Sequence, residues 1–347
     1  MNAHSYDAIL LMSFGGPEAM EDVMPFLDNV LRGKGVPDER KREVAHHYEE
    51  FGGVSPINAQ NRALKAALEK ELADRGVGLP VYWGNRNWEP YVTDVLREMK
   101  NAGVKKYLAL VTSGFSCYSG CRQYHEDLQR AQQALGEGLP QYDKIRVWYN
   151  HPLFIEVTKQ HWQQASAQLS AERRAGIHTL FTAHSIPHAM ANNSDYVAQL
   201  TEACRLTADA AGIVNWQLVY QSRSGPPHQP WLDPDIGVAL RALKEKGVQD
   251  VVVQPVGFIS DHMEVLFDLD HEAKELCEEI GLNMVRAATP GIHPLFVSML
   301  AELIQERLDP SKPKRAIGNR PPHHDVCPPN CCASGRPEGA GRPPHAR

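Results

Sequence analysis

The feature that most constrains the fold of this chain is a repeated alternation of short apolar runs with longer segments of helical spacing. The runs, apolar or rich in β-forming residues, occupy residues 6–14, 80–85, 105–113 and 144–149, and then 177–185, 215–222, 250–258 and 282–287. Apolar strands separated by helices of about 10 to 20 residues are typical of parallel sheets covered on both faces. Two sets of four such runs predict an α/β fold of two doubly wound domains.

The length of 347 residues agrees with two domains, because it exceeds the usual size of one. We expect one domain over residues 1–152 and a second over 153–310, with a helix starting near His151 at the boundary and a last helix over 294–308. Residues 311–347 form a tail rich in Pro, Gly, Arg and His. This tail has too little apolar surface to fold by itself.

Charge and hydropathy exclude several classes of protein. The formal net charge is −6 and no basic stripe with interleaved aromatic residues occurs, so nucleic acid is not an expected partner. The amino terminus lacks a basic region, and its apolar run is too short for a signal peptide. Because no run of 18 apolar residues occurs either, we expect no integral membrane segment and a soluble cytoplasmic protein.

The seven cysteines are an odd number and do not suggest a disulfide framework. Cys327, Cys331 and Cys332 lie within six residues of the tail and suggest a site for a soft metal or an iron–sulfur cluster. Adventitious metal affinity of a bare tail is the competing interpretation. The remaining cysteines are expected to be buried or unreactive thiols; they are Cys117, Cys121, Cys204 and Cys277.

In parallel α/β sheets the ligand lies beyond the carboxyl ends of the strands. His184 ends one apolar run, and Glu264 lies in the first turn of the helix that follows another. A lone histidine at such a position is commonly structural, but an imidazole titrates near neutrality and can accept a proton or bind a metal. If the two strand ends converge, His184 and Glu264 form a proton-accepting or metal-binding pair.

Glu264, Asp268 and Glu272 follow one another at four-residue steps with no Lys or Arg among them. Like charges at this spacing destabilise a helix by a few tenths of a kcal/mol per pair, roughly. A capping box from Asp261 to Glu264 and an apolar stripe on the opposite face would also suit a solvated helix surface. The row nevertheless begins at the ligand edge, and carboxylates with one histidine suit ferrous iron, manganese or magnesium.

Motifs for other chemistries are absent from the sequence: there is no HExxH, paired CxxC, GxGxxG or GxxxxGK[ST]. Two Gly- and Pro-rich stretches, "GNRNWEP" and "QSRSGPPHQPWLDPDI", read either as turns with helix caps or as parts of a ligand site. Their side chains Arg86, Trp88, Arg223 and Trp231 would suit a large planar anionic ligand.

With these residues in view, the chain resembles the ferrochelatases, which insert ferrous iron into a porphyrin. The resemblance covers nearly all of residues 5–308. It rests on a series of long motifs in order: "LLMSFGGPE", "RGKGVP", "HHYEEFGGVSPINAQN", "GNRNW", "YSGCRQYHEDL", "TAHSIP", "QSRSGPP" and "GFISDHMEVLFDLD". It implies two similar four-stranded parallel domains around an active-site cleft, with a porphyrin and ferrous iron as substrates.

The resemblance also implies roles for particular residues. His184 and Glu264 become the central catalytic and metal-binding pair, and Asp268 and Glu272 continue the acidic row as proton or metal ligands. The porphyrin contacts implied by the motifs are Phe14, Arg32, Ser55, Tyr124 and Trp231. Metalation removes two pyrrole protons, which an imidazole and a carboxylate row can accept and pass on.

The amino-terminal motifs look like those of enzymes that metalate coproporphyrin III in haem biosynthesis, and no apolar membrane-facing lip is found. We therefore expect coproporphyrin III as substrate, with protoporphyrin IX as the alternative, although many of these relatives have Tyr where this chain has Phe14. A cobalt or nickel chelatase and a non-catalytic tetrapyrrole or metal carrier are further alternatives. Other haem-pathway enzymes are the expected protein partners.

The tail resembles that of ferrochelatases holding a [2Fe–2S] cluster through three carboxyl-terminal cysteines and one internal cysteine. Cys327, Cys331 and Cys332 match the first three ligands. The internal ligand is expected near Val157 and Thr158, and neither is Cys. A cluster would thus need a fourth ligand from elsewhere in the chain.

Overall fold

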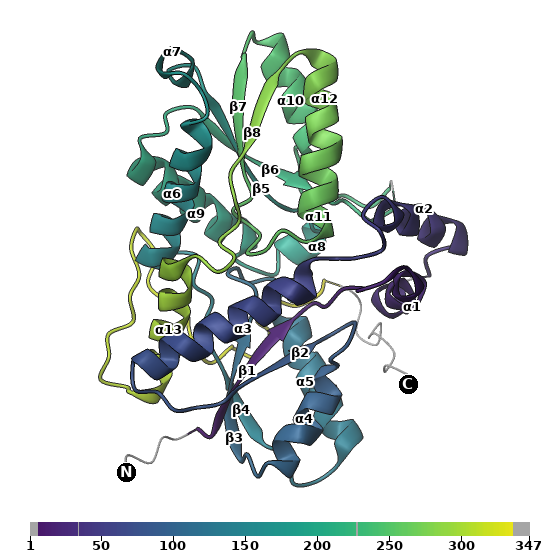
Figure 1. The fold of residues 1–347 in the computed structure, drawn as a ribbon, viewed down its shortest axis with the longest axis vertical. Helices are drawn as coiled ribbons and strands as arrows, with labels where there is room; N and C mark the ends of the chain where they lie inside the picture. The colour runs from purple at the N-terminus through teal and green to yellow at the C-terminus, as the bar shows by residue number, and fades with distance from the viewer. Residues whose placement is uncertain (1–5, 34, 227, 336–347) are drawn as a thin grey trace.

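Two four-stranded parallel sheets form the framework of the protein in the computed structural model, which describes residues 6–33, 35–226 and 228–335. The first sheet has the order β2-β1-β3-β4 and the second the equivalent order β6-β5-β7-β8 (Figure 1). The strands are β1 (Ala8–Ser13), β2 (Val81–Asn85), β3 (Lys106–Val111), β4 (Gln141–Lys144), β5 (His178–His184), β6 (Trp216–Gln221), β7 (Asp250–Gln254) and β8 (Asn283–Arg286). The predicted fold class is confirmed.

Helices connect the strands and cover both faces of each sheet (Figure 1). Those associated with the first sheet are α1 (Met20–Leu31), α2 (Asp38–Glu49), α3 (Ile57–Asp74), α4 (Val92–Asn101), the π-helix η1 (Tyr118–Arg122) and α5 (Gln123–Leu135). The remainder are α6 (Pro152–Ser166), α7 (Ala171–Arg174), α8 (His188–Ala191), α9 (Tyr196–Ala211), α10 (Ile236–Glu245), α11 (Met263–Val265), the π-helix η2 (Leu266–Ala273), α12 (Lys274–Ile280) and α13 (Pro294–Leu308). No helix in the described ranges is long and apolar enough to span a membrane.

The central strands β1 and β7 are buried along their whole length and mostly apolar, because helices cover both faces of the sheets. All six residues of β1 and all five of β7 are buried. If polar residues alternated along these strands, their side chains would face one of the helical layers without hydrogen-bond partners. A mostly apolar strand is therefore more stable at this position.

The fourth strand of the first sheet was expected over residues 144–149, but β4 ends at Lys144. Beyond the hydrogen bond from Ile145 N to the carbonyl of Ala109, the chain leaves the sheet. Arg146 is then held in a bidentate ion pair by Glu306 of α13, and Trp148 lies 6.4 Å from Phe296, ring centre to ring centre. Packing against α13 therefore overrides the strand propensity of this apolar run.

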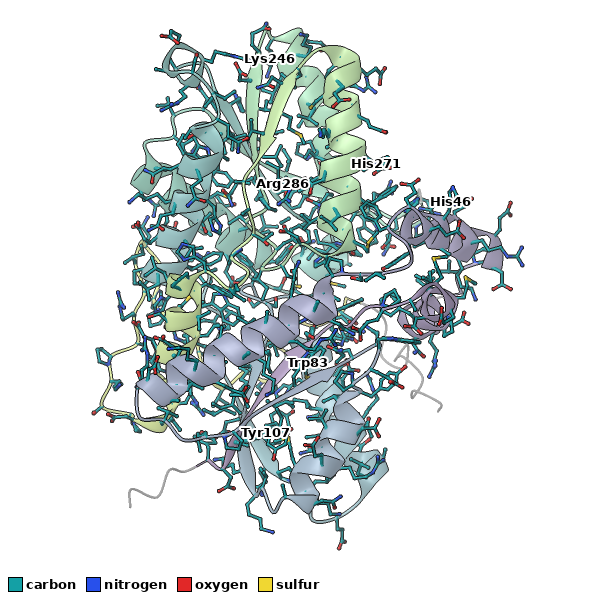
Figure 2. All side chains as sticks on the ribbon, in the orientation of Figure 1. His46, Trp83, Tyr107, Lys246, His271 and Arg286 are labelled. Carbon is teal, nitrogen blue, oxygen red and sulfur yellow. The ribbon has the colours of Figure 1, made fainter. Side chains whose placement is uncertain are left out.

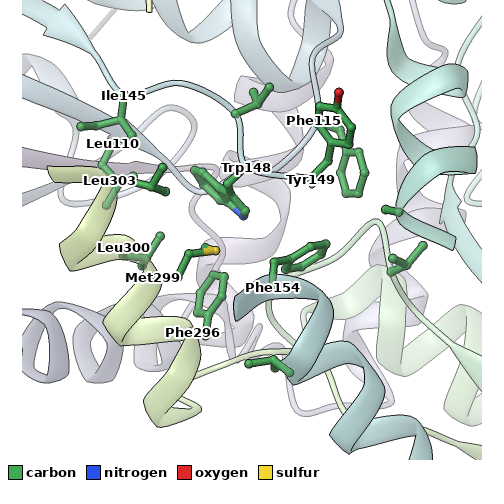
Figure 3. Packing of buried hydrophobic residues seen from close by; sticks show 14 of the residues in the cluster. Leu110, Phe115, Ile145, Trp148, Tyr149, Phe154, Phe296, Met299, Leu300 and Leu303 are labelled. Carbon is green, nitrogen blue, oxygen red and sulfur yellow. The ribbon is translucent and has the colours of Figure 1, made fainter. Parts of the chain in front are cut away.

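The two sheets share one hydrophobic cluster. It includes Ile9 and Leu11 of β1 together with Phe181 and Ala183 of β5. Helix α13 packs against both α3 and α6, and Figure 3 shows side chains of α6 and α13 meeting Trp148 between them. The predicted limits of the two domains remain a prediction, because the packing is continuous across residues 152–153.

The start of the tail, which was expected not to fold by itself, is held by specific contacts with the folded domains. Asn150 of the first domain donates through Nδ2 to the carbonyl of Arg320 at 2.9 Å and accepts from Ile317 N at 3.0 Å. Glu202 of α9 accepts from Asn319 N at 2.8 Å. Residues 311–335 thus use polar groups of the folded domains in place of an apolar core of their own. The expectation for residues 336–347 lies outside the described residues.

The buried Arg146–Glu306 pair yields a test of this packing. Both side chains are at most 5% exposed, with nitrogen–oxygen distances of 2.8 and 2.9 Å. Removing one partner of a buried pair leaves an uncompensated charge and costs about 3–5 kcal/mol. We expect Glu306→Ala to lower the free energy of unfolding by this amount, measured by denaturant titration. Asp74→Ala, which breaks an exposed pair with Lys70, is the control and should cost under about 1 kcal/mol.

Candidate active site

The carboxyl ends of β5 and β7 lie at one edge of the second sheet and bring His184 and Glu264 into contact. His184 is the last residue of β5, and Glu264 lies in α11, which follows β7 after a loop. His184 Nε2 is 3.1 Å from Glu264 Oε1. The side chains are 31% and 45% exposed, so the pair is accessible to a ligand.

The hydrogen bonds of His184 define its protonation. Its Nδ1 faces the carbonyl oxygen of Ser185, which can only accept, so Nδ1 carries a proton. The contact between Nε2 and a carboxylate oxygen then requires a second proton shared by the pair. Burial lowers the pKa of His184, but the charge and hydrogen bond of Glu264 more than offset this and raise the pKa to about 9. The pair therefore holds a proton at neutral pH, whereas a neutral imidazole was expected.

The helix that carries the acidic row is not a regular α-helix. Three segments, α11, η2 and α12, follow one another without a break, and η2 is a π-helix that contains Asp268 and Glu272. The wider turn of a π-helix brings residues four apart more nearly into line along its axis than an α-helix does. Such π segments are frequent at functional sites.

The expected capping box from Asp261 is wrong. His262 caps α11 instead, accepting a hydrogen bond from Glu264 N on its Nδ1 at 3.2 Å. Asp261 is bound by Arg286 at 3.0 Å and by Thr289 at 3.1 Å. Burial lowers the pKa of His262, so this imidazole is neutral and leaves its Nδ1 lone pair for the cap.

Asp268, the second acid of the row, lies in a more enclosed place than a solvated stripe would allow. Ser222 donates a hydrogen bond to it, and Gln221 Nε2 lies 3.4 Å from its Oδ2 and 2.6 Å from the carbonyl of Glu264. Burial raises the pKa of Asp268 to about 7, with a further contribution from the charge of Glu264. This carboxyl group can therefore gain or lose a proton near neutral pH.

The row ends at the surface. Glu272 is exposed at the surface. Its pKa is raised, first by loss of hydration and then by the neighbouring charges of Asp235, Glu275 and Glu50, while His271 has the opposite effect. Glu264, Asp268 and Glu272 thus lead from the histidine to solvent, with raised pKa values at the second and third positions.

Helix α2 and the start of α3 pack against this acidic segment. The ring of His47 stacks on Phe267 with centres 3.8 Å apart, and Glu50 lies 3.6 Å from His271. Figure 2 shows His271 on the side of its helix that faces α2. Gln60 of α3 also accepts from Asp261 N at 2.9 Å. Residues of the first domain therefore border the site on the second.

Of the expected porphyrin contacts, Phe14 and Tyr124 lie around one guanidinium group. Arg86 lies 4.5 Å from the ring centre of Tyr124 and 6.0 Å from that of Phe14. Arg86 is only 3% exposed and forms an ion pair with the equally buried Asp127. Its charge is therefore already compensated, and Arg86 does not offer the anion-binding group that the sequence suggested. Phe14 is 37% exposed, whereas Tyr124 is buried.

The other three expected contacts are spread over the two domains. Arg32 follows α1 and donates to Asn29 Oδ1 at 2.6 Å. Ser55 is 4% exposed and packs so closely on Gly16 that an added Cβ there would lie 2.8 Å from its Oγ. Trp231 forms an isolated β-bridge with Pro187, three residues beyond His184. Only Trp231 of these three lies in the domain of the His184–Glu264 pair.

Further residues support the His184–Glu264 pair. Tyr196 on α9 donates to the carbonyl of His184 at 3.0 Å, and nothing in the sequence marks this residue. Gln221 and Ser222 lie at the carboxyl end of β6 and begin the stretch "QSRSGPPHQPWLDPDI", which the sequence offered as part of a ligand site. Ser222 has a φ of +61°, an uncommon conformation for a residue with a side chain.

The tail cysteines gather at a second location. The ligand atoms of His324, Cys327 and Cys331 lie within 4.8 Å of one another, and the Sγ atoms of Cys331 and Cys332 are 3.5 Å apart. His324 was not predicted as part of this group. Val157 and Thr158, the positions expected to provide an internal ligand, are buried in α6 and offer no thiol.

Comparison with known proteins identifies the family. The model of the ferrochelatase family matches residues 6–308. The chain belongs to the ferrochelatase family. A ferrochelatase of Rhodopirellula baltica is 56% identical over 342 residues, covering 98% of this chain and 97% of that protein. A coproporphyrin III ferrochelatase of Streptomyces coelicolor is 49% identical over 362 residues, covering 98% and 96%.

A solved structure agrees at the level of the fold. SirB from Bacillus subtilis, determined with Fe3+, matches with a TM-score of 0.54 and 12% identity, covering 88% of this chain and 96% of that one. The predicted family and enzyme class, a lyase that inserts ferrous iron into a porphyrin, are confirmed by the family match and the ferrochelatase relatives.

The protonated pair leads to a prediction for NMR. The pKa of His184 is raised above the ordinary imidazole value near 6.5. Its ion pair therefore stabilises the folded protein fully below about pH 6.5, and this contribution is lost as the pH rises through about 9. We expect a histidine resonance, assigned by its loss in His184→Ala, to titrate near 9 and to shift toward 6.5 in Glu264→Gln. An unchanged midpoint in Glu264→Gln would contradict the pairing.

Proposed function

We propose that this ferrochelatase inserts ferrous iron into coproporphyrin III to give coprohaem in haem biosynthesis, and that metalation takes place at the His184–Glu264 pair. The contact of 3.1 Å between Nε2 and Oε1, at the inner end of a carboxylate row, is the observation that carries this proposal. A porphyrin must lose two pyrrole protons and gain a divalent cation, and the pair offers groups for both tasks.

The resting proton decides the order of events at the pair. His184 Nδ1 is bound by the Ser185 carbonyl, so Nε2 is the nitrogen that faces the reacting ring. Nε2 must first give up its proton before it can take one from a pyrrole or bind Fe²⁺. Glu264 receives that proton through their contact. Asp268, with a pKa of about 7, is the next acceptor, and Glu272 passes protons to solvent or admits the cation.

The expected ring contacts divide between the two domains in this proposal. Phe14 presents an exposed aromatic face on the first domain, and Trp231 lies beside the end of β5 on the second. Arg32 carries a charge suited to a propionate group. Ser55 and Tyr124 are buried and do not reach the ligand themselves in this proposal. Ser55 packs on Gly16, and Tyr124 packs on Arg86.

Replacing Glu264 tests the role of the pair. Gln keeps the shape of the side chain but removes its charge, so Glu264→Gln should bind coproporphyrin III and lose metalation by on the order of 10²–10⁴-fold. Turnover is followed anaerobically with ferrous iron as the free-porphyrin absorption bands disappear. Glu279→Gln, an exposed change on α12, is the matched control and should metalate normally. Near-normal turnover of Glu264→Gln would contradict the proposal and support the interpretation of the acidic row as a solvated helix surface.

The substrate is tested by direct competition of the two porphyrins. Relatives named coproporphyrin III ferrochelatase, at 49% and 50% identity over nearly the whole chain, support coproporphyrin III. We expect kcat/KM for coproporphyrin III to exceed that for protoporphyrin IX by at least about tenfold, which corresponds to about 1.4 kcal/mol. A preference for protoporphyrin IX would refute the assignment in favour of the alternative.

We further propose that the tail holds a [2Fe–2S] cluster. Cys327, Cys331 and Cys332 provide soft donors in one small volume, which suits a cluster better than the hard oxygen ligands of the active site. When bound, such a cluster supplies one-electron redox chemistry. The residues of this chain supply the thiolates and fix the tail on the first domain.

We also propose a cytoplasmic location and other haem-pathway enzymes as partners. All seven cysteines lie in the described residues and are free thiols, which supports a reducing compartment such as the cytoplasm. The substrate requires an enzyme that supplies a porphyrin and one that consumes the iron-loaded product, so other haem-pathway enzymes are the proposed partners.

A further inference from the structure

Arg286 lies at the same edge of the second sheet as the His184–Glu264 pair. It is the last residue of β8, which pairs in parallel with β7. Two carboxylates bind its guanidinium group: Nη1 donates to Asp261 Oδ1 at 3.0 Å, and Nε donates to Asp270 Oδ1. The side chain is 18% exposed, so the group lies against the protein surface and not in open solvent.

The two carboxylates are attached to different parts of the acidic helix. Asp261 precedes α11 and stands three residues before Glu264, whereas Asp270 lies in η2, two residues after Asp268. A guanidinium group is planar and holds its nitrogen donors in a rigid fork. Arg286 therefore fixes the distance between the loop that enters the helix and the middle of its π segment.

The first of these two points is anchored independently of the helix. Gln60 of α3 accepts from Asp261 N at 2.9 Å and donates through Nε2 to the Asp261 carbonyl at 3.3 Å. Thr289 donates to the carboxylate of Asp261 at 3.1 Å. Asp261 is thus held by the first domain and by the loop after β8, and the bond from Arg286 to Asp270 connects this anchor to the helix.

The π segment requires support from outside the helix. The π form is rare in proteins, and η2 lies between two α segments, so tertiary contacts must favour it here. Figure 2 shows Arg286 and His271 on opposite sides of the helix. On the His271 side, the contact with Glu50 is 3.6 Å long and both side chains are 39% exposed, which makes it weak. The less exposed Arg286 provides the stronger attachment.

We propose that Arg286 is a positioning residue for metalation: by joining Asp261 to Asp270, it holds the acidic helix in its π form and keeps Glu264, Asp268 and Glu272 in line. The carboxylates that it binds lie outside this row, so it acts on the row through the helix. This inference rests on the proposed function, in which the row moves protons or admits ferrous iron.

The rival explanation is that Arg286 acts on iron through its charge. Burial lowers the pKa of Arg286, but the hydrogen bond of Asp270 and the charges of both carboxylates more than offset this and raise it. The charge is therefore compensated locally. Arg286→Met removes a positive charge and Asp270→Asn removes a negative one, so a field effect would change iron uptake in opposite directions. Loss of the contact would weaken it in both variants.

The decisive comparison uses full-length protein, ferrous iron and coproporphyrin III without oxygen. We expect kcat/KM for ferrous iron to fall at least about tenfold in both Arg286→Met and Asp270→Asn, while the Kd for coproporphyrin III stays within about twofold. The double variant should be no worse than either single one, because both remove the same contact. Arg286→Lys keeps the charge but loses the fork, and should remain at least about fivefold below wild type.

Arg173→Met is the matched control. Arg173 binds Asp250 through Nε at 3.0 Å and through Nη2, at the opposite edge of the same sheet where β7 begins. This control loses a comparable ion pair and should keep kcat/KM for ferrous iron within about twofold of wild type. A tenfold loss in Arg173→Met would show a general effect of destabilising the sheet and overturn the proposal.

Hydrogen exchange followed by mass spectrometry tests the helix directly. Peptides covering residues 263–273 should exchange at least about tenfold faster in Arg286→Met and Asp270→Asn than in wild type or Arg173→Met. Unchanged exchange in peptides of the first domain shows that the variants are folded. If Arg286→Met fails to fold, Asp270→Asn tests the same contact from a carboxylate that is 35% exposed.

Three further results would overturn the proposal. They are opposite effects of Arg286→Met and Asp270→Asn on iron kinetics, additive losses in the double variant, and unchanged exchange of residues 263–273 in both single variants. Failure of wild type to metalate coproporphyrin III would instead refute the proposed function. The exchange experiment does not depend on turnover, so the two failures are distinguishable.

Discussion

The hydrophobic cluster shared by the two sheets determines where the functional side chains lie. It joins β1 of the first sheet to β5 of the second through α6 and α13, so the domains cannot move apart without exposing apolar surface. The end of β5 carries His184, and the start of α3 contacts Asp261 beside the acidic helix. Burial of apolar surface far from the chemistry thus fixes the geometry of a site made mostly of polar groups.

The acidic row shows how the fold accommodates like charges. Isolated carboxylates four residues apart repel each other, but here one is paired with an imidazolium and the next is hydrogen-bonded by Ser222. Burial further raises the pKa of Asp268 to about 7, so this group need not be ionised at neutral pH. The same features that reduce repulsion leave protons that can move, which is what a metalation reaction requires.

The tail follows a different principle from the core. Residues 311–335 are held by main-chain hydrogen bonds to Asn150, Glu202 and Arg122, with Cys332 as their most deeply buried thiol. Polar contacts of this kind contribute about 0.5–1.5 kcal/mol each, much less than a core.

Much of this protein could be predicted from its sequence. Apolar strands and intervening helices gave the two parallel sheets, because both patterns reflect burial along short stretches of chain, and the strand-end rule singled out His184 and Glu264. Three other features depend on contacts between residues that are distant in sequence, so only the tertiary structure decided them. Contact with Glu264 puts a proton on His184, packing against α13 ends β4 early, and the folded tail brings the thiols of Cys327 and Cys332 to Cys121. No local pattern encodes such contacts, because each requires the whole core to form first.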